Sequence, residues 1–273
     1  MTTSSKPFAN IKALLFDVFG TVVDWRGTTA RILHKQCLQT LDSDGELSES
    51  TKAAALAMDI SQWQAFTKEW LQQHADLVHS IAFANIDGRT PPPYKTIDEF
   101  MLESLPKLLE EWRLAELWDS KTTEYMSRAL QRSDPWPDSV AGIDAMNAAG
   151  FLTVTLGNGN KELLYNMAEH ANLHWTHIIS SADFQTYKPD LKIYSGAAEK
   201  LRLKGEECAL IAAHLYDLEA ARKCGYKTVF VDRPNEEKWS HEEMQKARDW
   251  VDIWVEIDED GLRTATERLV AQR

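Results

Sequence analysis

Short apolar runs alternate with segments of helical spacing through the second half of the chain. The expected strands are residues 152–156, 178–180, 208–212 and 228–231, and the expected helices are residues 139–149, 161–171, 191–201 and 218–224. Strands and helices that alternate in this way form right-handed crossovers between parallel strands. The alternation therefore predicts an α/β fold with a doubly wound parallel sheet.

Another apolar run, residues 11–16, lies near the N-terminus and is typical of a strand that a parallel sheet buries on both faces. Between this run and residue 139 the apolar residues recur at three- and four-residue steps, which indicates helices. We therefore predict a Rossmann-like core of residues 1–25 and 139–273, with an inserted all-α cap domain of residues 26–138. Such an insertion emerges beside the end of the first strand and can close over it.

Composition and charge restrict the possible partners. The chain has 273 residues, of which 44% are hydrophobic, so it can bury a sizeable core. Its net charge of −12 argues against binding to nucleic acid or to an anionic membrane. No apolar run can span a bilayer and no signal peptide is recognisable, so we expect a soluble, cytoplasmic protein. The three cysteines lack metal-ligand spacing and are expected to be reduced packing residues.

The first strand ends in a carboxylate that is followed by a glycine. Asp17 comes directly after the apolar run, and open α/β sheets bind their ligands at the carboxyl ends of the strands. Gly20 permits a sharp turn through which a substrate can approach. Asp17 is therefore a candidate nucleophile, although an aspartate in this place can also cap the next turn.

Two further segments offer groups that complement an anion or a carboxylate. The loop of residues 155–160 lies between a strand and a helix, so its backbone N–H groups can hold an anion, or the loop can be a simple tight connection. Lys188 precedes a proline and is therefore extended, which suits projection of its ammonium toward a carboxylate. The alternative for Lys188 is a solvated surface position.

His214 and Asp217 stand three residues apart where another predicted strand leads into a helix. The carboxylate can orient the imidazole for proton transfer. Taken alone, a helix-capping Asp217 and a packed His214 are the commoner arrangement. Because Asp17 and Lys188 are predicted at neighbouring strand ends, we favour the catalytic interpretation.

Residues 16–26 read Phe-Asp-Val-Phe-Gly-Thr-Val-Val-Asp-Trp-Arg. This stretch resembles the first motif of the haloacid dehalogenase superfamily, and it is most similar to the type II (S)-2-haloacid dehalogenase branch. The resemblance implies that Asp17 is a covalent nucleophile and that Thr21 is a hydrogen-bonding partner for the site.

Two later segments resemble further motifs of the same superfamily. Tyr-Lys-Pro-Asp at residues 187–190, followed by Tyr194, implies that Lys188 pairs with the nucleophile and keeps it ionised, and that Tyr194 belongs to the substrate site. The stretch Ala-Ala-His-Leu-Tyr-Asp-Leu at residues 212–218 is similar to members that use this turn near the hydrolytic water.

The chain departs from the family pattern at two places that concern substrate binding. Gly157 stands where the family usually has a serine, while Asn158 is retained, so Gly157 either leaves the contact to backbone N–H groups and Asn158 or admits a bulkier ligand. In the cap, Leu71 replaces the usual substrate-facing arginine if residues 69–74 align with that motif. Three other arginines can take its place: Arg26, Arg31 and Arg89.

The chain differs from the phosphatases of the superfamily at two further places, and these differences indicate the reaction type. Phe19 replaces the second aspartate that protonates a leaving alcohol in those enzymes. Residues 212–214 are Ala-Ala-His, so only Asp217 remains of the acidic residues that hold Mg²⁺, a cation that requires oxygen ligands. We therefore predict an enzyme that uses neither a metal nor another cofactor.

Displacement of a halide needs neither an acid for the leaving group nor a metal. Asp17 attacks the carbon that bears the halogen, halide leaves as a stable anion, and an aspartyl ester remains. Water then hydrolyses the ester, with His214, positioned by Asp217, as the expected base and activation by Lys188 as the alternative. Two backbone N–H groups are expected to face the developing oxyanion: those of Val18 and Phe19.

The leading hypothesis is therefore a metal-independent hydrolase that releases halide from small 2-halo carboxylates. One alternative is a related hydrolase with a non-halogenated substrate, because Gly157 and Leu71 both alter the expected carboxylate pocket. Another is a weakly active binding or regulatory protein of the same fold. The Trp-rich stripe of the cap can be core or the face of a homodimer.

Overall fold

A computed structural model of the protein describes residues 6–43, 45, 47–84 and 89–273. The chain divides into two compact units, one of Met1–Asp24 and Pro135–Arg273 and the other of Trp25–Asp134. The side chains of Trp136 and Ser139 donate hydrogen bonds to backbone carbonyls of the N-terminal segment, near the second junction of the two units. The boundaries after residues 25 and 138 stay predictions.

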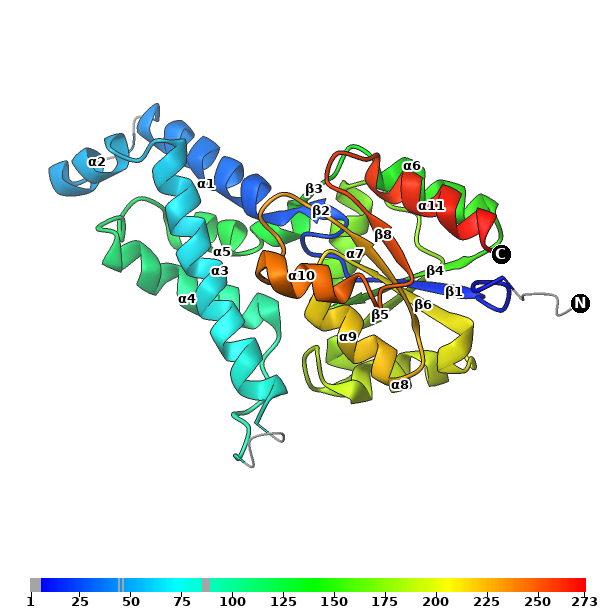
Figure 1. The fold of residues 1–273 in the computed structure, drawn as a ribbon. Coiled ribbons are helices and arrows are strands. Elements are labelled where there is room, and N and C mark those ends of the chain that lie inside the picture. The colour runs from blue at the N-terminus through cyan, green and yellow to red at the C-terminus, as the bar shows by residue number, and fades with distance from the viewer. Residues whose placement is uncertain (1–5, 44, 46, 85–88) are drawn as a thin grey trace, which may run out of the picture. The chain divides into compact units, whose positions relative to one another are not determined.

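The first unit is built on a six-stranded sheet in the order β5-β4-β1-β6-β7-β8, in which every neighbouring pair is parallel (Figure 1). The strands are β1 (Ala13–Phe16), β4 (Leu152–Gly157), β5 (His177–Ser180), β6 (Cys208–Ala212), β7 (Lys227–Val231) and β8 (Ile253–Val255). Two very short strands, β2 (Val23–Asp24) and β3 (Asp134–Pro135), form a separate two-stranded sheet.

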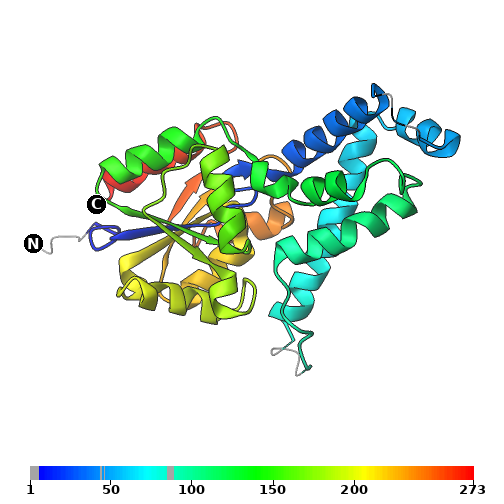
Figure 2. The same ribbon diagram turned by 180° about the vertical axis from the view of Figure 1, so that it is seen from behind.

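Helices cover both faces of the large sheet. They are α6 (Ser139–Ala148), α7 (Lys161–His170), α8 (Leu191–Lys200), α9 (Leu215–Lys223), α10 (His241–Ala247) and α11 (Gly261–Ala271). Figures 1 and 2 show α6 and α11 side by side on one face, with α8 and α9 on the other. Two 3₁₀ helices complete the unit: Ser181–Phe184 and Gly205–Glu207. The predicted doubly wound α/β fold is confirmed.

β1 lies at the point where the strand order changes direction. Its four residues are completely buried, and they pair with Leu152–Thr155 of β4 on one side and Cys208–Ile211 of β6 on the other. Later strands then extend outward from β4 in one direction and from β6 in the other. Open α/β sheets bind ligands at such a switch point, at the carboxyl ends of the strands. This places Asp17, the next residue after β1, at the expected location.

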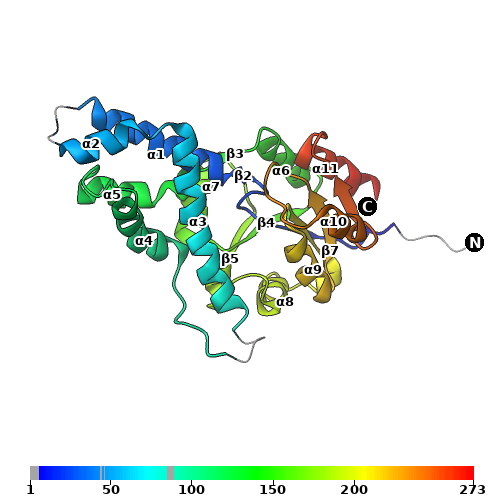
Figure 3. The ribbon, with the colours of Figure 1, turned by 60° about the vertical axis from the view of Figure 1, so that its left-hand side comes forward.

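The second unit is helical, as predicted for the cap domain (Figure 3). Its helices are α1 (Trp25–Leu41), α2 (Glu49–Leu56), α3 (Ile60–Ala82), α4 (Ile97–Glu111), α5 (Ser120–Ser127) and a 3₁₀ helix, Ala129–Arg132. α2 and α3 are separate helices, since α2 ends at Leu56 and Asp59 caps α3 by accepting a hydrogen bond from Gln62 N. Trp63, Phe66 and Trp70 are buried core residues. None of the helices in the described ranges is long and apolar enough to cross a membrane.

Candidate active site

Side chains that follow four parallel strands meet at the carboxyl edge of the sheet. Asp17 follows β1, Lys188 lies between β5 and α8, and His214 and Asp217 follow β6. A fifth group, Glu236, follows β7 and was not among the predicted site residues. Because the strands are fixed by their neighbours, these groups are held in place by rigid elements.

The centre of the cluster is the ammonium of Lys188, which lies between two carboxylates. Its Nζ is 2.6 Å from Asp17 Oδ1 and also donates to Asp217 Oδ2. All three residues are buried. Burial alone would raise the pKa of Asp17, but the positive charges and hydrogen bonds of Lys188 and His214 hold that pKa well below its usual range. Asp17 is therefore ionised, as a nucleophile requires.

Asp217 holds Lys188 and a tyrosine in place. The hydroxyl of Tyr194 donates to Asp217 Oδ1, and the backbone carbonyl of Tyr194 accepts a hydrogen bond of 2.7 Å from Tyr226. Burial and the nearby charge of Asp17 raise the pKa of Asp217, although Lys188 opposes the shift. The predicted group of Asp17, Lys188, Tyr194 and Asp217 is thus brought together by the fold.

The imidazole of His214 bridges two other carboxylates. Its Nδ1 is 2.9 Å from Asp17 Oδ2 and its Nε2 is 3.3 Å from Glu236 Oε2. The prediction that Asp217 orients His214 is wrong, because the Asp217 carboxylate faces Lys188 and Tyr194 instead. Glu236 orients the ring. The signal that could have found Glu236 is the acidic pair at residues 236–237 shortly after a predicted strand.

The two carboxylates give His214 an unusual protonation state. Burial disfavours the charged ring, but the hydrogen bonds and charges of Asp17 and Glu236 outweigh it and raise the pKa of His214 to about 10. The resting site therefore holds an imidazolium beside the nucleophile. A charged ring cannot accept a proton from water, so any role as a base requires an earlier change in charge.

Thr21 and Asn158 support the cluster through hydrogen bonds. Thr21 Oγ1 donates to Asp17 Oδ2 at 2.8 Å and accepts from Ala213 N, also at 2.8 Å. Asn158 Oδ1 accepts from the backbone N–H of Lys188 at 3.0 Å. The retained asparagine thus fixes the lysine, whatever it does for a substrate.

Gly157 and Gly20 lie against the site for different reasons. A Cβ on Gly157 would lie 3.4 Å from Val18 Cγ2, an ordinary contact, so there is room for a small side chain. Gly20 has φ +81°, and a Cβ there would come within 2.3 Å of Glu236 Oε2. Glycine at residue 20 is therefore needed for the turn and for the approach of Glu236. The oxyanion role of the Val18 and Phe19 backbone stays a prediction.

Comparison with protein families decides the relationship of the chain. The family of haloacid dehalogenase-like hydrolases matches residues 11–225. The chain belongs to this family.

Relatives of this hydrolase include enzymes whose activity is named. It is 31% identical to (S)-2-haloacid dehalogenase 1 of Pseudomonas sp. (strain CBS-3) over 144 residues, 52% of this chain but only 63% of that protein. Two similar crystal structures each cover 95% of the chain. One is L-2-haloacid dehalogenase PA0810, with 31% sequence identity, a TM-score of 0.74 and 99% of that chain covered. The other is the defluorinating L-2-haloacid dehalogenase Rha0230, with 29% sequence identity, a TM-score of 0.73 and 95% of that chain covered.

The candidate substrate arginines of the hydrolase all belong to the helical unit. Arg31 pairs with Asp134 at 3.1 Å, and the guanidinium of Arg26 lies 4.7 Å from the centre of the Trp25 ring. Leu71 is buried in α3. These contacts do not select one arginine, so each stays a candidate.

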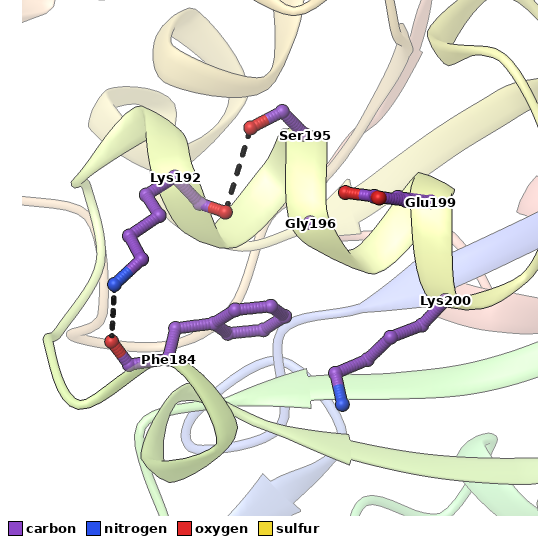
Figure 4. A pocket seen from close by; sticks show the side chains of 6 residues that line it. All are labelled: Phe184, Lys192, Ser195, Gly196, Glu199 and Lys200. Atoms are coloured by element: carbon purple, nitrogen blue, oxygen red, sulfur yellow. Dashed lines mark hydrogen bonds between the residues drawn. The ribbon is translucent and has the colours of Figure 1, made fainter.

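A pocket of about 450 Å³ lies beside α8 (Figure 4). It is lined by Phe184, Lys192, Ser195, Gly196, Glu199 and Lys200. Figure 4 shows Lys192 donating to the Phe184 carbonyl across its mouth. None of the described residues that line this pocket belongs to the cluster around Asp17, so the two are separate.

Replacing Lys188 by methionine should strongly destabilise the hydrolase near neutral pH. The substitution leaves Asp17 and Asp217 buried without their shared cation, which should cost about 3–5 kcal/mol of unfolding free energy. Without Lys188 the pKa of each carboxyl should rise in the folded state above its value in the unfolded state. As the pH falls, the folded state then binds protons at a higher pH than the unfolded state does, so stability should recover. Urea denaturation at pH 8 and pH 5 measures this effect. Lys161→Met, which removes an exposed lysine while Asp183 keeps its second partner Lys200, should change little at either pH.

The raised pKa of His214 predicts a pH window for its contribution to stability. Because the folded-state pKa is about 10 against an ordinary 6.5, the contribution is fully present below about 6.5 and is lost as the pH rises through about 10. NMR titration of the ring should show the high midpoint, and Glu236→Gln should lower it. Glu219→Gln, at the exposed surface, should leave the midpoint unchanged. A wild-type midpoint near 6.5 would contradict the assignment.

Proposed function

We propose that this hydrolase releases halide from small 2-halo carboxylates through an ester on Asp17. The observation that carries the proposal is the ionised Asp17 carboxylate, buried at the end of β1 and 2.6 Å from the Lys188 ammonium. A buried carboxylate oxygen attacks the carbon that bears the halogen. The carbon–halogen bond breaks, its electron pair leaves with the halide, and no acid is needed for the leaving group. Phe19 stands where such an acid would be expected.

The second step returns the carboxylate. Water attacks the Asp17 carbonyl carbon and gives one proton to a base. The ester bond breaks, its alkoxide oxygen takes the second proton of the water, and the hydroxy acid leaves while Asp17 returns to a carboxylate. Burial lowers the pKa of Lys188, but Asp17 and Asp217 outweigh it and raise that pKa. Asp217 still pairs with the ammonium after the ester forms, so Lys188 is a poor candidate for the base. His214 is the better candidate.

Formation of the ester prepares His214 for that role. The ester carries no charge, so the interaction between Asp17 and the imidazolium that raises the pKa of His214 is lost. The ring can then release its proton to solvent and accept one from the attacking water, while Glu236 keeps it oriented. The order of events follows from the charges, since the base becomes available only after the nucleophile has reacted.

The position of Lys188 also supports a reaction without a metal. Its ammonium fills the place between Asp17 and Asp217 where a divalent cation would need both carboxylates. The residues that precede His214, Ala212 and Ala213, offer no side-chain oxygen. The net charge of −12 supports the absence of a nucleic-acid partner, whereas a homodimer and a cytoplasmic location remain predictions from the sequence.

The substrate class is supported by the names of the similar proteins. PA0810 and Rha0230 are L-2-haloacid dehalogenases with about 30% identity across 95% of this chain. The space beside Gly157 favours a second candidate, a hydrolase that accepts a bulkier or non-halogenated acid. The complete and ionised site gives less support to a purely regulatory protein.

Halide release tests the proposal directly. The wild type should release halide from 2-chloropropionate or a related acid, and Asp17→Asn should lower kcat by about 10³-fold or more. Asp144→Asn, which alters an exposed pair with His174, should match the wild type. In a single turnover in H₂¹⁸O, label should enter Asp17. Label found only in the product would rule out the ester, and no release across a broad panel of 2-halo acids would reject the substrate class.

His214→Gln should separate the two steps. Lys188 still keeps Asp17 ionised in this variant, so the first turnover should release one halide per site. Hydrolysis of the ester should then slow by about 10²–10⁴-fold, because the base is missing. Rapid-quench mass spectrometry should show the accumulated ester. Loss of the initial burst together with turnover would place His214 in the first step instead.

A further inference from the structure

Three consecutive backbone carbonyls after the nucleophile are held by side chains from distant segments. The carbonyl of Gly20 accepts from Trp136 Nε1 at 2.8 Å, and that of Thr21 accepts from Arg233 Nε at 3.0 Å. The carbonyl of Val22 accepts from Ser139 Oγ at 2.7 Å. We call these three donors the carbonyl clamp. A loop held at three successive residues has little freedom to move.

Arg233 is the charged member of the clamp, and it is itself held by Asp138. Its two terminal nitrogens each lie 2.7 Å from an oxygen of Asp138, whose Oδ2 also accepts from Leu262 N at 2.6 Å. Both side chains are only 7% exposed. Burying such a pair costs desolvation energy and is weak evidence of a role in stability. The bidentate geometry does give a fixed orientation, which suits a positioning role.

The backbone beside this pair is adapted to it. Gly261 has φ +40°, and a Cβ there would lie 2.3 Å from Asp138 Oδ2 and 2.7 Å from Arg233 Nη1. The start of α11 therefore packs directly on the ion pair. Trp136 adds a further contact, with its ring centre 5.6 Å from the guanidinium carbon.

Arg233 connects to the reacting groups along two routes. Along the first, it holds the carbonyl of Thr21, whose hydroxyl donates to Asp17 Oδ2. Along the second, the Arg233 carbonyl accepts from Glu236 N at 3.3 Å, and Glu236 contacts His214 Nε2. The nucleophile is thus supported by the Arg233 side chain, and the ring that contacts it is supported by the backbone of the same residue.

We propose that Arg233, fixed by Asp138, is a positioning residue that keeps Asp17 and His214 aligned for hydrolysis of the ester. The reaction in this inference rests on the proposed function, whereas the contacts of Arg233 do not depend on it. Arg233 touches no reacting atom, so its side chain acts through Thr21 and its backbone carbonyl through Glu236. Misplacement of a reacting group by about 1 Å can cost about 10²-fold in rate.

The test compares Arg233→Lys and Trp136→Phe with Arg273→Lys. Lysine keeps the positive charge of residue 233 but loses the bidentate contact with Asp138 and the Nε donor. Trp136→Phe removes one hydrogen bond of the carbonyl clamp and leaves the ion pair in place. Arg273→Lys alters a surface arginine that binds the Ala149 carbonyl. Both clamp variants should lower kcat by about tenfold or more with KM within about twofold, and the ester should accumulate. The control should equal the wild type.

Two further measurements distinguish positioning from a general loss of structure. In a Thr21→Val background the effect of Arg233→Lys on kcat should shrink, because the route from the Arg233 side chain to Asp17 through Thr21 is already cut, whereas an effect unrelated to Thr21 would be additive. NMR titration of His214 requires no haloacid activity. Its midpoint should fall by about one pH unit in Arg233→Lys and stay unchanged in Arg273→Lys.

The outcomes separate the two proposals. If the wild type releases no halide but the His214 midpoint moves as stated, the positioning role stands and the proposed function fails. If halide is released while kcat and the midpoint are unchanged in folded Arg233→Lys and Trp136→Phe, the positioning role is rejected. Thermal melting establishes that each variant is folded, and Trp136→Phe decides the question if Arg233→Lys does not fold.

Discussion

The buried ammonium of Lys188 is the constraint on which the site depends. An unpaired cation could not be buried at this depth, so two carboxylates must meet it with good geometry. Asp17 and Asp217 are 200 residues apart in the sequence, and the ends of the adjacent strands β1 and β6 bring them together. The parallel sheet and its switch point therefore serve an electrostatic requirement as much as a packing one.

Much of this arrangement could be predicted because each part has a local signal. Asp17 and Asp217 follow continuous apolar runs, and such runs in an alternating α/β pattern identify parallel strands. Lys188 had no such run beside it and was recognised from the Tyr-Lys-Pro-Asp resemblance. Strand β8 was missed, since it has only three residues with a half-exposed Trp254 between two buried ones, at the edge of the sheet. Short edge strands carry little hydrophobic pattern.

The partner of His214 could not be predicted from spacing alone. Asp217 lies three residues away, but His214 has an extended backbone at the start of α9, and Asp217 already belongs to the first helical turn. Their side chains consequently point to different neighbours. Glu236 is 22 residues from His214 and reaches it only because β6 and β7 are adjacent. Sequence distance indicates which residues are close, whereas backbone conformation decides which of them touch.

The charges around Asp17 also limit how a substrate carboxylate can be recognised. Asp17, Asp217 and Glu236 outnumber the two cations Lys188 and His214, and the nearby guanidinium of Arg233 is occupied by Asp138. An incoming anion therefore gains nothing from the cluster itself. It needs neutral donors, such as the backbone N–H groups of the loop before α7, or a guanidinium from outside the cluster. Gly157, at the start of that loop, has no side chain, and selectivity among acids at this loop stays a prediction.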